Sequence, residues 1–249
     1  MQTLTQNPKI GRLVGEIAAE FPATIPFFES VKIDYCCGGN RTLKDACALA
    51  GVPLEQVLDA LGEIQRGPSR GPKEETDWNQ KSMAELTNYI LEKHHSYTRT
   101  ATSRLRILAE KVARVHGNHH LELLEINGLI QQMGEELEGH MAKEEEQVFP
   151  YLQAVEKAGG KKEGIPDPFA GGPMDQHPLK VLMWEHGMTG EEWIQLHQLS
   201  RDFTPPEDAC GSYRALYEGL RELESDLHRH VHLENNILFP KAVAAGIID

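Results

Sequence analysis

The chain is poor in cysteine, in aromatic residues and in basic side chains. Four cysteines occur among its 249 residues, and two of them are adjacent, which is poor material for a disulfide-stabilised scaffold. The 25 basic side chains are outnumbered by 38 acidic ones, giving a net charge of -13. This balance argues against nucleic-acid binding, which usually needs a basic face, and against docking on an anionic membrane.

Long apolar runs are also missing. No stretch approaches the roughly 18 apolar residues of a membrane-spanning helix, and the first residues lack the basic-then-apolar pattern of a signal peptide. We therefore expect a cytoplasmic protein. Aromatic residues make up only 6% of the chain and clusters of β-branched residues are rare, so the composition favours an all-α fold.

Glycine and proline divide the chain into two expected domains. Residues 67–72 read GPSRGP, and such a cluster indicates a linker. We expect a small helical N-terminal domain over residues 1–66, a linker over residues 67–76 and a larger helical domain over residues 77–249. Short helices of the N-terminal domain are expected near residues 10–20 and 25–30, after Thr42 and after Pro53.

The larger domain carries four long helical patterns of apolar residues. They cover about residues 79–115, 119–157, 179–200 and 207–239. Residues 159–178, rich in Gly and Pro, indicate a long loop between the second and third helices. Four helices of this length predict a four-helix bundle.

Histidine is concentrated in this bundle, and part of it follows an internal repeat. The second and fourth expected helices share a histidine, a glutamate four residues later and a following Phe-Pro pair, with His140 and Glu144 in one and His230 and Glu234 in the other. The first and third helices share a Glu-His fragment that includes His95 and His186. The repeat predicts a pseudo-two-fold axis through the bundle.

The repeated His-Glu pairs lie on the apolar seam of their helices. In the fourth helix, His230 and Glu234 continue a stripe of leucines at steps of three and four residues. A carboxylate in a core costs several kcal/mol unless it is paired or bound to a metal, and neither seam carries a Lys or Arg there. Two carboxylates facing across a pseudo-two-fold axis would also repel each other, so the pattern predicts a metal site.

The number of candidate ligands favours two metal ions. Six side chains are too many for one tetrahedral zinc and suit two ions with bridging carboxylates. Imidazole with carboxylate points to iron or manganese. The candidates are His95, His140, Glu144, His186, His230 and Glu234.

Periodicity leaves several neighbouring positions open. His94 fits an apolar stripe as well as His95 does. Glu136, one turn before His140, and Glu185 are either acidic groups near the site or along a channel, or exposed helix charges. Of the other histidines, His197 is expected in a satisfied core position, His116 at the periphery, and the remaining ones in solvent or near the site: His119, His120, His228 and His232.

A second unusual feature is the adjacent pair Cys36 and Cys37 between Asp34-Tyr35 and two glycines. Adjacent cysteines do not readily bridge to each other, and the helix expected after Thr42 would favour thiolate nearby. A reactive or metal-receiving thiol pair is one interpretation, and two partly buried cysteines are the other. Cys47 and Cys210 are expected to be ordinary helix residues.

Taken together, DYCCGG, HMAKEE with its following FP, the EH fragment and HVHLENNILFP resemble the iron–sulfur cluster repair di-iron proteins, the repair-of-iron-centres family of the YtfE/ScdA type. The resemblance covers about residues 8–244. It implies a cysteine-bearing N-terminal domain and a hemerythrin-like four-helix bundle that holds two non-haem irons with carboxylate and oxo bridges. By motif, it favours His95 over His94 and gives the ligands as His95, His140, Glu144, His186, His230 and Glu234.

The same resemblance implies a function. Family members repair iron–sulfur clusters damaged by nitrosative or oxidative stress, so damaged iron–sulfur proteins would be the partners and donation of labile iron the mechanism. Cys36 and Cys37 match the family's vicinal pair and would carry the iron, while Glu136 and Glu185 match positions near the site. Nitric oxide reduction and diatomic-gas binding are the alternatives, so enzymatic activity stays open. The family is compatible with a homodimer.

Overall fold

A computed structural model describes residues 10–66, 76–168 and 178–247. Within these ranges the chain is helical, and the only β-type pairing is an isolated antiparallel bridge between Leu13 and Thr42. The all-α prediction is therefore confirmed. The expected linker lies almost wholly outside the described residues. Residues 169–177 of the expected loop at residues 159–178 lie outside them as well. Among the described helices, none is long and apolar enough to cross a membrane.

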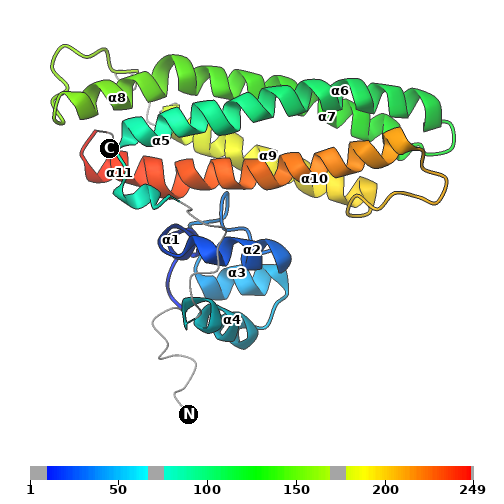
Figure 1. Ribbon diagram of the computed structural model, residues 1–249, viewed down its shortest axis with the longest axis horizontal. Coiled ribbons are helices and arrows are strands. Elements are labelled where there is room, and N and C mark those ends of the chain that lie inside the picture. Colours follow the sequence, from blue (N-terminus) through cyan, green and yellow to red (C-terminus); the bar gives the residue numbers. More distant parts are fainter. Residues whose placement is uncertain (1–9, 67–75, 169–177, 248–249) are drawn as a thin grey trace.

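The N-terminal part folds into a small helical unit with its own apolar core (Figure 1). The side chain of Thr42 accepts a hydrogen bond of 3.2 Å from the backbone N–H of Asp45 and so caps the third helix. Gly51 ends that helix in the left-handed conformation, with φ of 68°. The helices are α1 (Val14–Glu20), α2 (Ile25–Ser30), α3 (Leu43–Ala50) and α4 (Leu54–Arg66).

The remaining helices form a long bundle above this unit in Figure 1. Helix α6 packs against α7 and α10, and α7 packs against α9. A capping box formed by Ser82 and Glu85 marks the start of the first bundle helix, Met83–Tyr89. The bundle comprises α5 (Met83–Tyr89), α6 (Ser96–His116), α7 (Glu122–Lys143), α8 (Phe149–Lys157), α9 (Pro178–Ser200), α10 (Gly211–Leu233) and α11 (Phe239–Ala244).

Three of the four expected long helices contain a π-helical segment, which sequence periodicity did not predict. These segments are η4 (Ile90–His95), η5 (Glu144–Val148) and η7 (Glu234–Leu238). Each one begins or ends at a candidate ligand. Local π-helical turns widen the spacing along a helix and occur often at functional sites. Here they change the register of the seam where the polar residues enter the core.

The apolar core of the bundle is divided into two clusters along the helices. One contains Leu105 and Tyr217, and the other contains Ile90 and Phe149. The repeated histidines and glutamates fall between these clusters along the chain and are buried. The polar layer therefore has apolar packing at both of its ends along the bundle.

The N-terminal unit docks on the end of α10 and on η7, next to this polar layer. Val231 joins the apolar cluster of the N-terminal unit. The side-chain amide of Asn236 donates a hydrogen bond of 3.1 Å to the backbone carbonyl of Tyr35, and the ring of His232 packs edge-on against Tyr35 at 5.4 Å. This contact brings the cysteine loop up against the bundle.

We predict that Gly15→Ala weakens this docking. A Cβ at Gly15 would lie 2.1 Å from the Oδ1 atom of Asn236 and 3.0 Å from the backbone carbonyl oxygen of Gly39, so the Asn236 side chain, which donates to Tyr35, has to move. Overpacking of this kind costs about 1–3 kcal/mol, and we expect a loss of that order in the free energy of unfolding measured with urea. Gly128→Ala is the control, since a Cβ there meets nothing within 4 Å. Equal stability of the two variants would contradict the docking contact.

Candidate metal centre

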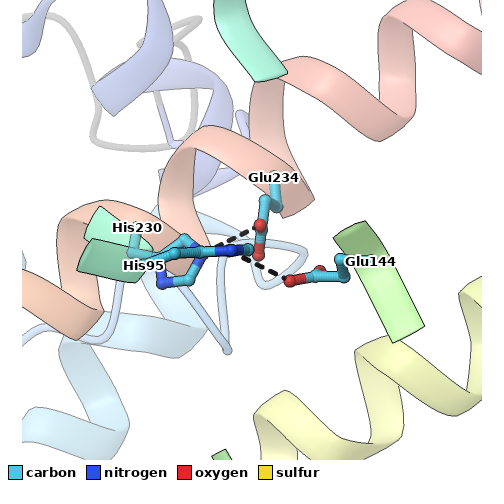
Figure 2. Close-up of side chains that lie close together, drawn as sticks. All are labelled: His95, Glu144, His230 and Glu234. Atoms are coloured by element: carbon cyan, nitrogen blue, oxygen red, sulfur yellow. Dashed lines mark hydrogen bonds and ion pairs between the residues drawn. The ribbon is translucent and has the colours of Figure 1, made fainter. Parts of the chain in front are cut away.

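Six buried side chains meet in the polar layer of the bundle. They form two overlapping groups whose donor atoms, one from each residue, lie within 4.8 Å of one another. Glu144 and Glu234 belong to both groups, and Figure 2 shows them facing His95 and His230. The structure therefore brings together all six positions that the repeat and the family motif singled out. The groups are His95, Glu144, His230 and Glu234, and His140, Glu144, His186 and Glu234.

Within each group, the imidazole nitrogens point at each other. The Nε2 atoms of His95 and His230 are 3.1 Å apart, and those of His140 and His186 are 2.9 Å apart. Two nitrogens bound to one metal at right angles, with bonds of about 2.1 Å, would be separated by roughly 3.0 Å. The spacing of each histidine pair therefore fits two ligands of a common cation.

The two glutamates fit the same interpretation. Glu144 and Glu234 are fully buried, and both oxygens of Glu144 and one of Glu234 lack a hydrogen bond from any described residue. The Glu144 oxygens lie 3.3 Å from Nε2 of His95 and 3.4 Å from Nε2 of His140. Buried carboxylate oxygens that accept no hydrogen bond are costly, and the groups nearest to them are the same imidazoles, so the residue set fits a bound cation.

Proton affinities in the cluster reflect the same charges. Burial lowers the pKa of His140, but the carboxylates of Glu144, Glu185 and Glu234 outweigh this and raise it to about 10. The pKa of His95 is also raised, since Glu144 and Glu234 outweigh its burial. In the metal-free chain these carboxylates therefore favour protonated imidazoles. Metal binding has to displace such protons, so the metal affinity is expected to rise with pH.

Hydrogen bonds at the outer nitrogens orient three of the four rings. A carboxylate or amide oxygen accepts from Nδ1, which leaves the Nε2 lone pair free for a cation. Arg99 in turn holds Glu145 at 2.8 Å, and Lys143 is ion-paired with Glu185. The bonds are His95 to Glu145 at 2.7 Å, His140 to Glu185 at 2.9 Å and His186 to Asn235 at 3.0 Å.

Glu145 and Asn235 escaped the sequence analysis. Each directly follows one of the shared glutamates, so the repeat places them at equivalent positions. The repeat is visible in the sequence, but it gives no reason to place these two polar residues beside the site rather than on an exposed helix face. Glu185 was expected either near the site or as an exposed helix charge. In the structure it lies near the site and accepts a hydrogen bond from Nδ1 of His140.

The periodicity did not separate His94 from His95, whereas their contacts differ. Nε2 of His95 faces the centre, but Nδ1 of His94 donates to Asp226 at 3.0 Å. The His94 ring is buried and stacks on His230 with centroids 5.5 Å apart.

A cavity of about 330 Å³ opens beside the centre between α7, α9 and α10. Glu136 lines it together with Glu192, a residue that the sequence analysis did not single out. The side-chain amide of Gln132 donates to Glu136 at 2.9 Å. Burial and the nearby Glu136 raise the pKa of Glu192 to about 7. The cavity reaches His140, His186 and His230.

The raised pKa of Glu192 predicts a pH-dependent stability. An unfolded glutamate has a pKa near 4.3. The raised pKa of Glu192 therefore leaves the free energy of unfolding unaffected at low pH, where the carboxyl is protonated in both states, and lowers it as pH rises from about 4 to 7. We expect Glu192→Gln to gain stability over the parent chain across this range and to keep the gain at pH 8, measured by urea unfolding of the metal-free protein. Glu191→Gln, at an exposed neighbour, is the control. A pH-independent difference would contradict the shift.

The vicinal cysteines lie against the bundle. The thiol of Cys37 donates to the backbone carbonyl of His186 at 3.3 Å, and Cys36 is buried. Asp34, Cys36 and Cys37 form a third group with metal-ligand spacing. The neighbouring Cys37 and burial raise the pKa of Cys36. The net effect on Cys36 therefore disfavours thiolate, contrary to the expectation from the following helix.

His232 takes the second of its two expected positions: it is buried against Tyr35, and burial lowers its pKa to about 4. Two other residues differ from expectation. The side chain of His197 is 30% exposed and pairs with Asp202 and Glu224, so it does not lie in the core. Cys210 is the exposed residue before α10 and lies 3.1 Å from Nε2 of His116. It is therefore a helix-terminal residue rather than an ordinary helical one.

Comparisons with known proteins identify the family. Residues 10–65 match a domain of unknown function (DUF542), and residues 86–242 match the hemerythrin HHE cation binding domain. The iron-sulfur cluster repair proteins YtfE of Yersinia pseudotuberculosis serotype O:1b (strain IP 31758) and Yersinia pestis (strain Pestoides F) are each 33% identical over 92% of this chain and 96% of their own length. The chain belongs to the YtfE family of iron-sulfur cluster repair proteins. The hemerythrin-like bundle and the predicted family are thus confirmed, and the matched cation-binding domain contains the His-Glu groups that have the spacing to hold a metal ion.

Proposed function

We propose that this chain repairs iron–sulfur clusters damaged by nitrosative or oxidative stress by donating labile iron to them. The observation that supports this proposal is the buried centre of four imidazoles and two shared carboxylates. It occurs in a chain that resembles the iron-sulfur cluster repair proteins named above along almost their whole length. Damaged iron–sulfur proteins are then its partners.

The donor set supports two non-haem irons. His95 and His230 would hold one, His140 and His186 the other, and Glu144 and Glu234 would bridge them, with an oxo bridge between the metals. When bound, the pair supplies redox-active iron that imidazole and carboxylate hold less tightly than four thiolates would hold it. The chain's own residues orient three of the four ligand rings through hydrogen bonds at Nδ1.

The cysteine loop is proposed as the receiver of the donated iron. Cys37 contacts the backbone of His186, and Asn236, two residues after the shared ligand Glu234, contacts the backbone of Tyr35, so the loop lies beside residues of both halves of the centre. Asp34, Cys36 and Cys37 offer one carboxylate and two sulfurs at metal-ligand spacing. An iron ion leaving the centre would meet softer ligands here on its way to a client protein.

We predict that Cys36→Ala combined with Cys37→Ala slows iron delivery severalfold without lowering the iron content of the chain. Delivery is measured as the recovery of activity by apo-aconitase under anaerobic conditions. Cys47→Ala serves as the control, since Cys47 is buried in α3 away from the bundle ligands. Delivery by the double variant at the rate of the unmodified chain would contradict the role of the pair.

The cavity favours one second candidate function. It borders His140, His186 and His230 and gives a small molecule a route to the centre, so nitric oxide or another diatomic ligand is a candidate substrate or ligand there. Nitric oxide reductase activity would produce nitrous oxide under turnover while the iron stays bound. Reversible oxygen binding that is indifferent to Cys36 and Cys37 would instead indicate a gas-binding protein.

A further inference from the structure

The internal repeat allows the two halves of the metal centre to be compared ligand by ligand. One half consists of His95 and His230, and the other of His140 and His186, with both glutamates shared. Because the carboxylates are common, any difference in how the halves hold a cation has to come from the histidines and their outer contacts.

One histidine in each half has a carboxylate as its outer partner. Nδ1 of His95 donates to Glu145 at 2.7 Å, and Nδ1 of His140 donates to Glu185 at 2.9 Å. Each of these carboxylates is also ion-paired with a cationic side chain, Arg99 or Lys143. A carboxylate partner raises the basicity of a metal-bound imidazole and fixes its orientation. These two contacts are of the same kind and favour neither half.

The other histidine of each half breaks the symmetry. Nδ1 of His186 donates to the side-chain oxygen of Asn235 at 3.0 Å. Nδ1 of His230 is buried and finds no hydrogen-bond partner among the described residues. Nothing therefore selects the tautomer of His230 that leaves Nε2 free for a metal.

His94 accounts for the missing contact. In the repeat it stands where the other half has Glu185, directly before a candidate ligand. Glu185 reaches across to His140, whereas His94 stacks flat on His230 and gives its own Nδ1 hydrogen to Asp226 at 3.0 Å. A ring that is stacked in this way packs against His230 but accepts no hydrogen bond from it.

We propose that the two halves hold iron unequally and that the ion bound by His95 and His230 is the one that leaves. The inference rests on the proposed function, because it names which iron the repair protein would give up. Loss of one outer partner of a metal-bound histidine typically costs 10–100-fold in metal affinity. Release is an exchange of ligands in the ferrous state, and no electron is transferred.

The test is anaerobic release of iron to a chromophoric ferrous chelator in excess, using the full chain loaded with ferrous iron. We expect two phases of equal amplitude that differ at least tenfold in rate. Asn235→Leu removes the partner of His186 and should accelerate the slow phase about tenfold or more. Asn235→Asp keeps an acceptor of the same shape, so two phases should persist. A slow phase that Asn235→Leu leaves unchanged would overturn the proposal.

A matched pair of ligand variants assigns the phases to the halves. His230→Gln should retain the slowly released ion, and His186→Gln should lose it, as read from iron content after the chelator and from the Mössbauer spectrum of the remaining iron. The reverse assignment, or release of both irons from the unmodified chain at one rate, would overturn the inequality.

The outcomes separate this inference from the repair function. Unequal release without any iron gained by an apo iron–sulfur protein would contradict repair and leave the inequality standing. Single-rate release with intact delivery would overturn the inequality alone. A chain that takes up no iron would overturn both.

Discussion

Two carboxylates buried side by side in the core of a helical bundle set the constraint on which the rest of the structure depends. Glu144 and Glu234 are fully buried, and several of their oxygens have no hydrogen bond from the described residues. Mutual repulsion and desolvation would make this core unfavourable without compensating positive charge. Protonated histidines can supply it in part, but the inward Nε2 atoms in pairs about 3 Å apart suit metal ions better.

The surroundings of the centre follow from that constraint. Apolar clusters pack on both sides of the polar layer, and π-helical turns at ligand positions accompany the meeting of side chains from four helices at one point. Outer carboxylates and an amide orient three of the four rings. The small N-terminal unit then covers the outside of α9 and α10 with its cysteine loop. The outer contacts are unequal, since Nδ1 of His230 has no hydrogen-bond partner among the described residues, and this inequality underlies the proposed unequal release.

The fold and the set of residues at the centre could be predicted from sequence because a repeated histidine and glutamate interrupt otherwise apolar seams. Because a buried carboxylate is costly without a compensating positive charge, Glu144 on such a seam already predicted a cation nearby. The choice between His94 and His95 could not be made from periodicity, since the π-helical segment Ile90–His95 changes the register there. Glu192 was missed because its burial and raised pKa depend on packing between helices that are distant in sequence.

We propose that the two buried carboxylates, Glu144 and Glu234, bind a pair of metal ions. The most direct measurement is the iron content per chain after anaerobic reconstitution and desalting, for the unmodified protein and for a variant combining Glu144→Leu with Glu234→Leu. The account predicts two irons per chain in the first, and loss of both in the second while the helical circular dichroism signal is retained. A folded unmodified chain that binds no iron, or equal iron content in the two proteins, would contradict it.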